Sequence, residues 1–497
     1  MELDFDFSKF PDKMKVRGYD RTELFSDKGS SSIVYTPGDL VEDILDLMPT
    51  EIWSNPDITF LNPCCKNGVF LDRIYWRLEE GLKEQIPSFI DRSDHIFTKQ
   101  LFGLALTDKQ ADISRGVLYG ASNASSPNVY TTRFKDREGN IKTLKLMVDG
   151  IECDYKQIIK EGSGAALQKT IEGAFGDMKF NVIIGNPPYQ ESTGDGTQAR
   201  AIYNEFVEKS IQMSPDYIAM IIPSKWFGGG MGLNSFRTMM MNNKHIEKYV
   251  HYFDAKECFE NVKIAGGVGY FLYNRGYNGM CNFTNIMSNN RNTLNRYLSD
   301  YKFVLANNSS VCIIDKVISK KEPSMAKIAS PISLFGLPTT AEYSTMQAKE
   351  DDLMLYTGGN IGYISNDAVT KGREYVGSYC AMVGAATSGN ADQYENIKVF
   401  TLVDIKRPGE VSTQAYIMIG KWDNEETAAN CVTYLKTKFC RFLLQAALSS
   451  IHISADKFCF VPMQDFTKPW TDAELYKKYN LTKEEIGFIE STIRPME

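Results

Sequence analysis

Histidine and closely spaced cysteines are scarce in this sequence of 497 residues. It holds only four histidines, none of its ten cysteines lies at CxxC spacing, and it contains no HExxH motif. A zinc site needs several such ligands close together, so we expect no metal. The cysteines are scattered along the chain, and without a secretory signal this pattern predicts reduced thiols.

Long apolar runs and a basic leader are also missing. No stretch approaches the roughly 20 apolar residues of a membrane span, and the opening residues, MELDFDFSKF, are acidic. Neither a signal peptide nor a transit peptide is indicated. We therefore expect a cytoplasmic protein that makes no contact with a membrane.

A surplus of basic residues is likewise absent. The formal net charge is −7, whereas proteins that bind nucleic acid usually carry a basic surplus. Any contact with DNA would need a local basic face. With 497 residues, 43% of them hydrophobic, the chain is long enough for two or three globular domains.

Short apolar runs alternate with amphipathic segments from residue 33 to about residue 275. This alternation is typical of a parallel sheet covered by helices. Strands are predicted at 59–62, 100–106, 180–184, 217–222 and 267–273, and helices at 36–48 and 201–211. In the first helix, Thr36 is the expected N-cap and Pro37 the first helical residue.

The composition changes after residue 275. Residues 276–330 are polar and rich in asparagine, which we interpret as a domain boundary or a loop-rich junction. From about residue 300 to the end, glycine-rich and β-branched stretches precede a helical tail. The C-terminal part is therefore predicted to form a separate α+β domain.

Residues 180–190, FNVIIGNPPYQ, join a predicted strand to the motif Asn-Pro-Pro-Tyr. Pro187 and Pro188 lack a backbone N–H and hold φ near one value, so the chain leaves the strand as a stiff, extended loop. Such a loop presents the Asn186 amide and the Tyr189 ring in a fixed orientation. The alternative is a rigid turn with a tyrosine in the core.

A second predicted strand, in FLNPCCKNGVF at residues 60–70, ends at a turn with Asn62, Pro63 and Gly68 and opens into an amphipathic helix. In a parallel sheet such a turn lets backbone N–H groups and the helix N-terminus face a ligand at the carboxyl edge. A single glycine at a strand-to-helix turn is also ordinary turn geometry, so this motif alone is weak.

The linear order of these motifs resembles that of the S-adenosylmethionine-dependent adenine-N6 DNA methyltransferases in which a TP motif comes first. More narrowly, the chain resembles the Eco57I-type restriction-modification methylases. The matching segments are YTPGDLV (35–41), FLNPCCKNGVFLDRI (60–74), LFGLALTDKQADISRGVLY (101–119), KFNVIIGNPPYQ (179–190), MIIPSKWFGGGMGLNSFR (220–237), FENVKIAGGVGYFLYN (259–274) and the tail at 458–490.

This resemblance implies an α/β fold, with a Rossmann-like methyltransferase domain at 34–290 that has a mostly parallel sheet. An N-terminal extension would occupy residues 1–33, and an α+β target-recognition domain with a helical tail would occupy residues 300–497. The implied reaction transfers a methyl group from S-adenosylmethionine to N6 of an adenine that is flipped out of double-stranded DNA.

The NPPY residues are the implied catalytic group. The N6 amine is a poor nucleophile because its lone pair is delocalised into the ring, so acceptors for the N6 hydrogens are required. The Asn186 side-chain oxygen and the Pro187 carbonyl would accept them, and Pro188 would hold that carbonyl in place. Tyr189 would stack on the flipped base. No general base is needed if the proton leaves to solvent.

The resemblance also implies cofactor contacts at Tyr35, Thr36, Pro37, Asn62, Pro63, Cys64, Gly68 and Asp108. Thr36 would contact the methionine carboxylate. Two positions depart from the family pattern: Asn62 stands where most members have aspartate, and Ala105 stands where a carboxylate usually grips the ribose. Asp108 is the nearest substitute for that carboxylate, or else a solvated residue at a helix start.

Substrate contacts are predicted at Lys225, Arg237, Tyr270 and Phe271. Lys225 and Arg237 flank glycines that would allow close approach to a phosphate or a base, or would form a flexible connector. Tyr270 and Phe271 would wall the pocket for the flipped base, or would simply belong to the core of a strand.

The expected partner is double-stranded DNA, a separately encoded restriction endonuclease would be a further partner, and the protein is expected to be a monomer. Two alternatives stay open. An NPPY methyltransferase could act instead on RNA or on protein glutamine. A non-catalytic DNA-recognition subunit would explain Asn62 and Ala105, although an intact NPPY motif argues against it.

Overall fold

The structure is a computed structural model with two compact units of chain. It describes residues 36–105, 108–119, 129–131, 133–135, 141–143, 146–148, 151–153, 179–192, 199–230, 232–259, 264–347, 349–388 and 396–496. The first unit ends at Leu298, and the second contains residues 299–497 together with the short segments 225–229 and 287–292.

The first unit is built on a nine-stranded sheet within the described residues, in the order β15-β14-β12-β13-β11-β8-β1-β2-β3. Its strands are β1 (Phe60–Asn62), β2 (Leu101–Ala105), β3 (Val129–Thr131), β8 (Val182–Gly185), β11 (Tyr217–Pro223), β12 (Ile246–Tyr252), β13 (Val268–Asn274), β14 (Cys281–Met287) and β15 (Asn290–Arg296). Short strands outside this sheet are β4 (Arg133–Lys135), β5 (Ile141–Thr143), β6 (Leu146–Val148), β7 (Ile151–Cys153), β9 (Gln190–Ser192) and β10 (Ala199–Ala201).

The strand directions confirm the predicted α/β class. Strands β3, β2, β1, β8 and β11 run parallel, and β12 runs parallel to β14, whereas β13 is antiparallel to both β11 and β12. All residues of β1, β2 and β8 are buried, because helices cover both faces of a parallel sheet. Each of the five strands expected from the sequence is present.

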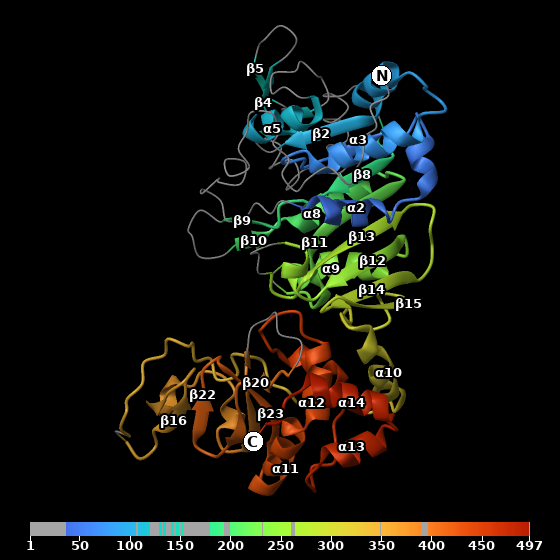
Figure 1. The fold of residues 1–497 in the computed structure, drawn as a ribbon. Coiled ribbons are helices and arrows are strands. Elements are labelled where there is room, and N and C mark those ends of the chain that lie inside the picture. The colour runs from blue at the N-terminus through green and yellow to red at the C-terminus, as the bar shows by residue number, and fades with distance from the viewer. Residues whose placement is uncertain are drawn as a thin grey trace. The chain divides into compact units, whose positions relative to one another are not determined.

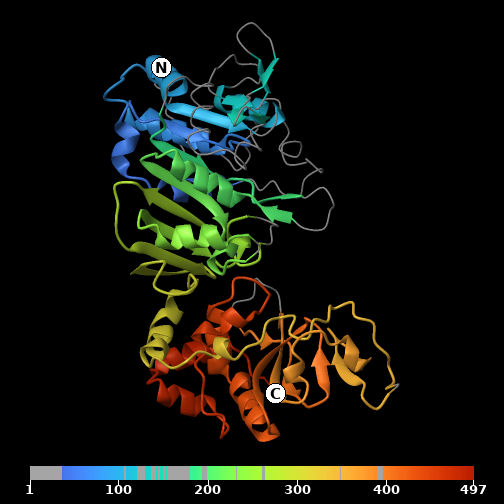
Figure 2. The same ribbon diagram turned by 180° about the vertical axis from the view of Figure 1, so that it is seen from behind.

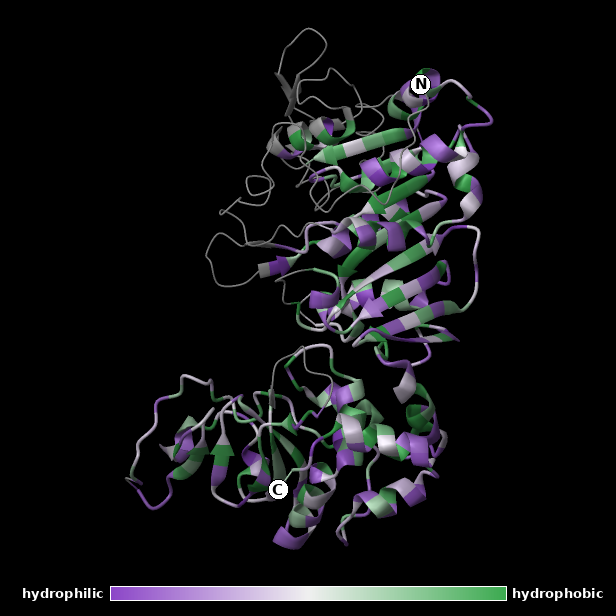
Figure 3. Ribbon diagram, viewed as in Figure 1, coloured by the Kyte–Doolittle hydropathy of each residue, from purple (hydrophilic) through white to green (hydrophobic). Residues whose placement is uncertain are grey.

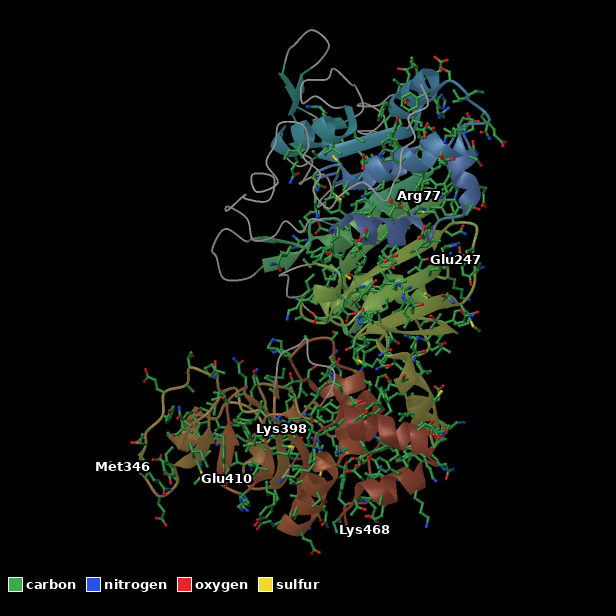
Figure 4. All side chains as sticks on the ribbon, viewed as in Figure 1. Arg77, Glu247, Met346, Lys398, Glu410 and Lys468 are labelled. Carbon is green, nitrogen blue, oxygen red and sulfur yellow. The ribbon has the colours of Figure 1, made fainter. Side chains whose placement is uncertain are left out.

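Helices lie on both faces of this sheet (Figures 1 and 2). They are α2 (Gly38–Leu45), α3 (Val69–Gly81), α4 (Phe89–His95), α5 (Asp108–Tyr119), α8 (Tyr203–Gln212) and α9 (Asn234–Asn242). The guanidinium of Arg77 on α3, labelled in Figure 4, donates to carboxylates of Glu42 and Asp46 on or next to α2, each at 2.6 Å. These two ion pairs hold α2 against α3.

The start of α2 corrects one prediction. Pro37 occupies the N-cap position with φ −58° and ψ 148°, and no side chain caps the helix, so Thr36 is not its N-cap. Proline holds φ near the helical value, but its extended ψ delays the first helical residue to Gly38. The hydroxyl of Thr36 is thereby available for another contact.

The asparagine-rich segment contains regular structure rather than only loops. Strands β14 and β15 occupy residues 281–296 and extend the sheet of the first unit. Ser288 and Asn289 join them with φ values of 50° and 65°. Positive φ at both positions of a two-residue turn is the geometry that tight hairpins require, and asparagine tolerates it well. The loop-rich alternative for this segment was therefore wrong, whereas a division between the two compact units does fall within it, after Leu298.

The second unit is α+β, as expected. Its strands are β16 (Leu353–Tyr356), β17 (Ile361–Ile364), β18 (Tyr379–Gly384), β19 (Thr387–Ser388), β20 (Val399–Phe400), β21 (Val403–Lys406), β22 (Glu410–Ser412) and β23 (Tyr416–Trp422). They form the small sheets β17-β16-β22, β21-β18-β23 and β19-β20. Its helices are α10 (Val311–Ser319), α11 (Glu425–Lys436), α12 (Lys438–Ala446), α13 (Asp472–Lys478) and α14 (Lys483–Thr492).

Local sequence explains the helical tail. Thr471 caps α13 and Thr482 caps α14, and the glutamates three residues later return the hydrogen bond in two capping boxes. Figure 3 shows hydrophobic strands inside each unit and helices with one polar and one apolar face. Among the described helices, none combines the length and the apolar character that crossing a membrane would require.

Candidate active site

Two of the sequence motifs meet at the carboxyl edge of the central sheet. Strand β1 ends at Asn62 and the adjacent parallel strand β8 ends at Gly185, with Leu61 paired to Ile183. Strand β2 pairs with the other side of β1, so the order of strands reverses between β8 and β1. In open α/β sheets the ligand crevice lies at such a switch point.

The TP motif reaches the NPPY loop through one buried hydrogen bond. The side-chain nitrogen of Asn186 donates to the hydroxyl of Thr36 at 3.0 Å, and both side chains are buried. Because the amide nitrogen is used toward Thr36, the amide is oriented with its oxygen on the other side. Thr36, which precedes α2, thus fixes the orientation of Asn186, which follows β8.

The turn from β1 to α3 is held by backbone and side-chain bonds. The Cys64 N–H donates to Asn62 Oδ1 at 3.0 Å, and the Cys65 N–H donates to the Leu104 carbonyl at 2.9 Å. Gly68 then takes the N-cap position of α3 with φ 81°, a left-handed conformation that glycine adopts without strain. It has no side chain to cover the N–H groups of the first helical turn, which can face a ligand.

Gly185 brings the two motifs into direct contact. A Cβ atom at this position would lie 2.6 Å from Asn62 Oδ1 and 3.3 Å from Cys64 Sγ. Only a residue without a side chain allows the end of β8 to approach so closely the turn between β1 and α3, for which the family resemblance implies cofactor binding and which we call the cofactor turn. The glycine before the NPPY motif is therefore a packing requirement of the site.

Burial keeps two thiols and one phenol of this region in their neutral forms. It raises the pKa of Cys64 to about 12 and that of Cys65 to about 11. It also raises the pKa of Tyr189 well above its ordinary value. Neither a thiolate nor a phenolate therefore forms here near neutral pH, so the NPPY loop offers neutral polar groups and an aromatic ring.

The structure brings together most of the predicted catalytic and cofactor residues at this edge. They are Thr36, Asn62, Pro63, Cys64, Gly68, Asn186, Pro187, Pro188 and Tyr189. Pro37 follows Thr36 and is exposed. Tyr35 lies outside the described residues. Asp108 is the first residue of α5, and its side chain also lies outside the description.

The predicted substrate residues are less concentrated. Lys225 follows β11 in the short helical segment Ser224–Phe227 and groups with the second unit, whereas Arg237 lies on α9 of the first unit. Tyr270 and Phe271 are adjacent in β13 and both buried. Successive strand residues point to opposite faces, so these two rings cannot line the same wall of a pocket.

Sequence reasoning missed Lys66, which lies in the cofactor turn with φ 46° and is buried. It also missed Ser114 on α5, whose hydroxyl donates to the Lys66 carbonyl at 2.9 Å and anchors the turn. The letter sequence carries no signal for the contact with Ser114. For Lys66, the available signal was a lysine directly before Asn-Gly in this turn.

A parallel sheet with a glycine turn and an NPPY loop at its switch point defines the class of α/β methyltransferases. Residues 99–259 match the family described as Eco57I restriction-modification methylase. The chain is 34% identical over 300 residues to a Mycoplasma pneumoniae protein named as an uncharacterized adenine-specific methylase, covering 52% of this chain and 71% of that protein. The chain therefore belongs to the Eco57I-type restriction-modification methylases.

One solved structure supports the fold. The chain resembles a nuclease-deletion mutant of the Type ISP restriction-modification enzyme LlaGI in complex with a DNA substrate mimic, with TM-score 0.50 and 10% identity over 87% of this chain and 46% of that one. A modification subunit of a type I restriction enzyme from Vibrio vulnificus matches with TM-score 0.33 and 14% identity over 52% of this chain and 48% of that one. The chain thus spans about half the length of these two structures.

Proposed function

We propose that this protein transfers a methyl group from S-adenosylmethionine to N6 of adenine in double-stranded DNA, as the modification component of a restriction-modification system. The hydrogen bond from Asn186 to Thr36 carries the proposal, since it fixes an acceptor loop beside the cofactor turn. The adenine specificity named for the Mycoplasma pneumoniae relative supports the choice of base.

The orientation of Asn186 suits an amine substrate. Its amide nitrogen points to Thr36, so its oxygen can accept a hydrogen from the exocyclic N6 amine. The Pro187 carbonyl is the second acceptor, and the following proline restricts its direction. Two fixed acceptors would draw the amine toward tetrahedral geometry and leave its lone pair available for the methyl group. Removing one such preorganised group typically costs about 10²- to 10³-fold in rate.

The residues of the β1–α3 turn fit the amino-acid end of S-adenosylmethionine. The Asn62 side-chain nitrogen is buried and has no hydrogen-bond partner among the described residues, so a ligand atom could satisfy it. Gly68 and the N-terminus of α3 offer backbone N–H groups to the same ligand. When bound, this cofactor supplies an activated methyl group on a sulfonium centre.

Tyr189 would hold the target base outside the duplex. Its ring is attached rigidly behind two prolines and lies next to the acceptors of the same loop. Stacking on an aromatic ring is worth about 1–3 kcal/mol per base, which offsets part of the cost of flipping. The chain's own contribution is thus to hold, orient and polarise the adenine.

We assign the methyltransferase role to residues 34–290 and target recognition to residues 300–497, with residues 1–33 as an extension. The catalytic residues proposed are Asn186, Pro187, Pro188 and Tyr189, and the cofactor residues include Thr36, Asn62 and Gly68. We further propose a cytoplasmic monomer that works beside a separately encoded endonuclease.

The decisive experiment is expression in a host that lacks DNA methylation, followed by genome-wide mapping of modified bases. We expect N6-methyladenine at one short recognition sequence, and none with Asn186→Ala. Purified protein should also transfer label from S-adenosylmethionine to duplex DNA rather than to RNA or to a protein glutamine. Label on cytosine, RNA or protein would refute the proposal.

Cofactor binding separates an enzyme from a non-catalytic recognition subunit. A ligand present at 100 times its dissociation constant stabilises a protein by about 2.7 kcal/mol. We expect millimolar S-adenosylmethionine to raise the melting temperature. The absence of any shift would favour the non-catalytic alternative.

A further inference from the structure

The backbone of Lys66 is strained. Its φ of 46° lies in the left-handed region, which a side chain disfavours and glycine adopts freely. Both sides of the residue are anchored, since the Cys65 N–H donates to Leu104 and the Lys66 carbonyl accepts from Ser114. Strained conformations persist where the surroundings enforce them, and they gather at functional sites. The side chain of Lys66 is therefore worth a functional explanation.

The ammonium group of Lys66 is buried in the cofactor turn. The residue is only 6% exposed, whereas lysines normally keep their charge in water. Burial lowers its pKa to about 8, and Cys64 would oppose this change only as a thiolate. That thiol is neutral near pH 7, because its own pKa is raised to about 12. Cys64 Sγ lies 3.3 Å from the position of a Cβ on Gly185, next to the NPPY loop.

Asn62 presents a second donor. Its oxygen accepts the Cys64 N–H at 3.0 Å, and since an N–H can donate only to the oxygen, the other end of the amide is the NH₂ group. Asn62 is 1% exposed, and its nitrogen has no partner among the described residues. A buried donor without an acceptor is costly, which indicates that a ligand supplies the acceptor.

We propose that Lys66 and Asn62 together bind the carboxylate of the cofactor's methionine part. This inference rests on the proposed function. An aspartate at position 62 would offer an acceptor to the cofactor's ammonium group, whereas this chain offers an amide donor and a buried cation in the same turn. The turn therefore offers positive and donor groups where an aspartate would offer a negative one. It would hold the carboxylate of the cofactor's amino-acid end rather than its ammonium group. This assignment replaces the contact between Thr36 and the carboxylate that the family resemblance implies, since the Thr36 hydroxyl accepts a hydrogen bond from Asn186.

Binding calorimetry with two cofactors tests this directly. S-adenosylmethionine and its decarboxylated analogue differ only in the carboxylate. Lys66→Met should weaken binding of S-adenosylmethionine by about tenfold or more, as expected for loss of a charge-assisted hydrogen bond, and should leave the analogue within about twofold of its wild-type affinity. Asn62→Asp should also weaken S-adenosylmethionine, because a carboxylate at this position repels the carboxylate of the ligand and neutralises Lys66.

Two further variants control for folding. Lys66→Gly relieves the left-handed strain and should fold as the wild type does, yet lose the preference for the carboxylate. Lys83→Met removes an exposed lysine that pairs with Glu80, just beyond α3, and should change neither affinity.

The outcomes separate the two proposals. If the wild type binds S-adenosylmethionine but Lys66→Met weakens both cofactors equally or neither, the carboxylate assignment is wrong while the enzyme proposal stands. If Asn62→Asp strengthens binding, position 62 faces the ammonium group and the assignment is also wrong. If the wild type binds neither cofactor, the proposed function fails and this inference fails with it.

Discussion

The side-chain amide of Asn186 donates a hydrogen bond of 3.0 Å to the hydroxyl of Thr36, which lies 150 residues earlier in the chain. This bond makes the TP motif a positioning element for the NPPY loop. Thr36→Val keeps the branched shape but removes the acceptor. We expect a loss of about tenfold in the rate of single-turnover methylation. Thr36→Ser keeps a hydroxyl and should recover most of that rate, and a serine variant as slow as the valine variant would contradict the positioning role.

Asn186→Ala should slow methyl transfer severely, because it removes one of the two acceptors that we propose for the N6 amine. The expected decrease is about 10²- to 10³-fold or more. Affinity for S-adenosylmethionine, measured by calorimetry, should stay within about threefold of the wild type, since the cofactor turn is built mainly from other residues. An equal loss of affinity and of rate would assign Asn186 to cofactor binding instead.

Gly185→Ala should slow the reaction without unfolding the protein. The added methyl group would meet Asn62 Oδ1 at 2.6 Å, so the end of β8 must move away from the cofactor turn. A displacement of about 1 Å in a catalytic group can cost about 100-fold in rate. Gly377→Ala is the matched control, because no atom lies within 4 Å of the added methyl group. Equal activities of the two variants would contradict the proposal that the site requires a glycine at position 185.

Tyr189 should tolerate loss of its hydroxyl but not of its ring. Burial raises the pKa of the Tyr189 phenol well above its ordinary value, so the side chain stays neutral and is expected to act through its ring, and Tyr189→Phe should methylate DNA nearly as fast as the wild type. Tyr189→Ala should be slower by about tenfold or more. The defect should shrink on duplexes mismatched at the target adenine, because those bases flip at lower cost. Equal defects on paired and mismatched targets would argue against stacking.

The stability of the first unit should depend on His251 in acid. Burial lowers the pKa of this residue from 6.5 to about 3, and Ser224 Oγ lies 2.9 Å from its Nδ1. Between these two values the unfolded chain binds a proton that the folded chain does not. The free energy of unfolding should therefore fall as the pH decreases from 6.5 toward 3.

Variants at two histidines can isolate this effect. Denaturant unfolding of His251→Asn should show a smaller pH dependence in that interval than the wild type, although the variant is less stable at pH 7. His452→Asn alters an exposed residue and should keep the wild-type slope. Identical slopes for wild type and His251→Asn would show that other groups govern the acid transition.

The sequence predicted those features that follow from local chemistry. The strands β1, β8 and β11 follow from short apolar runs and the rigid loop from Pro187 and Pro188, and the helical tail was expected as well, although its capping threonines were recognised only in the structure. Parallel strands place their carboxyl ends at one edge, so the meeting of the two motifs was also predictable.

Other features depend on three-dimensional context that the letters do not contain. The hairpin of β14 and β15 was missed because its asparagines read as loop, although positive φ at Ser288 and Asn289 makes them a tight turn. Strand β12 was missed because Glu247 and Lys248 interrupt its apolar pattern. The left-handed backbone of Lys66 and the orientation of the Asn62 amide are set by Ser114 and Cys64, from contacts that no spacing rule describes.

The division of the chain has a consequence for engineering. Residues 225–229 and 287–292 group with the second unit, although the chain returns to the first unit after each of them. Within the second unit, the Gly228 carbonyl accepts a hydrogen bond from Lys457 at 2.8 Å and the Lys225 carbonyl accepts one from Ser449 at 3.2 Å. In a hybrid that takes only the part after residue 298 from a relative, residues 225–229 would lose their native hydrogen-bond partners. Chimeras should stay soluble only when residues 225–229, 287–292 and 299–497 are exchanged together.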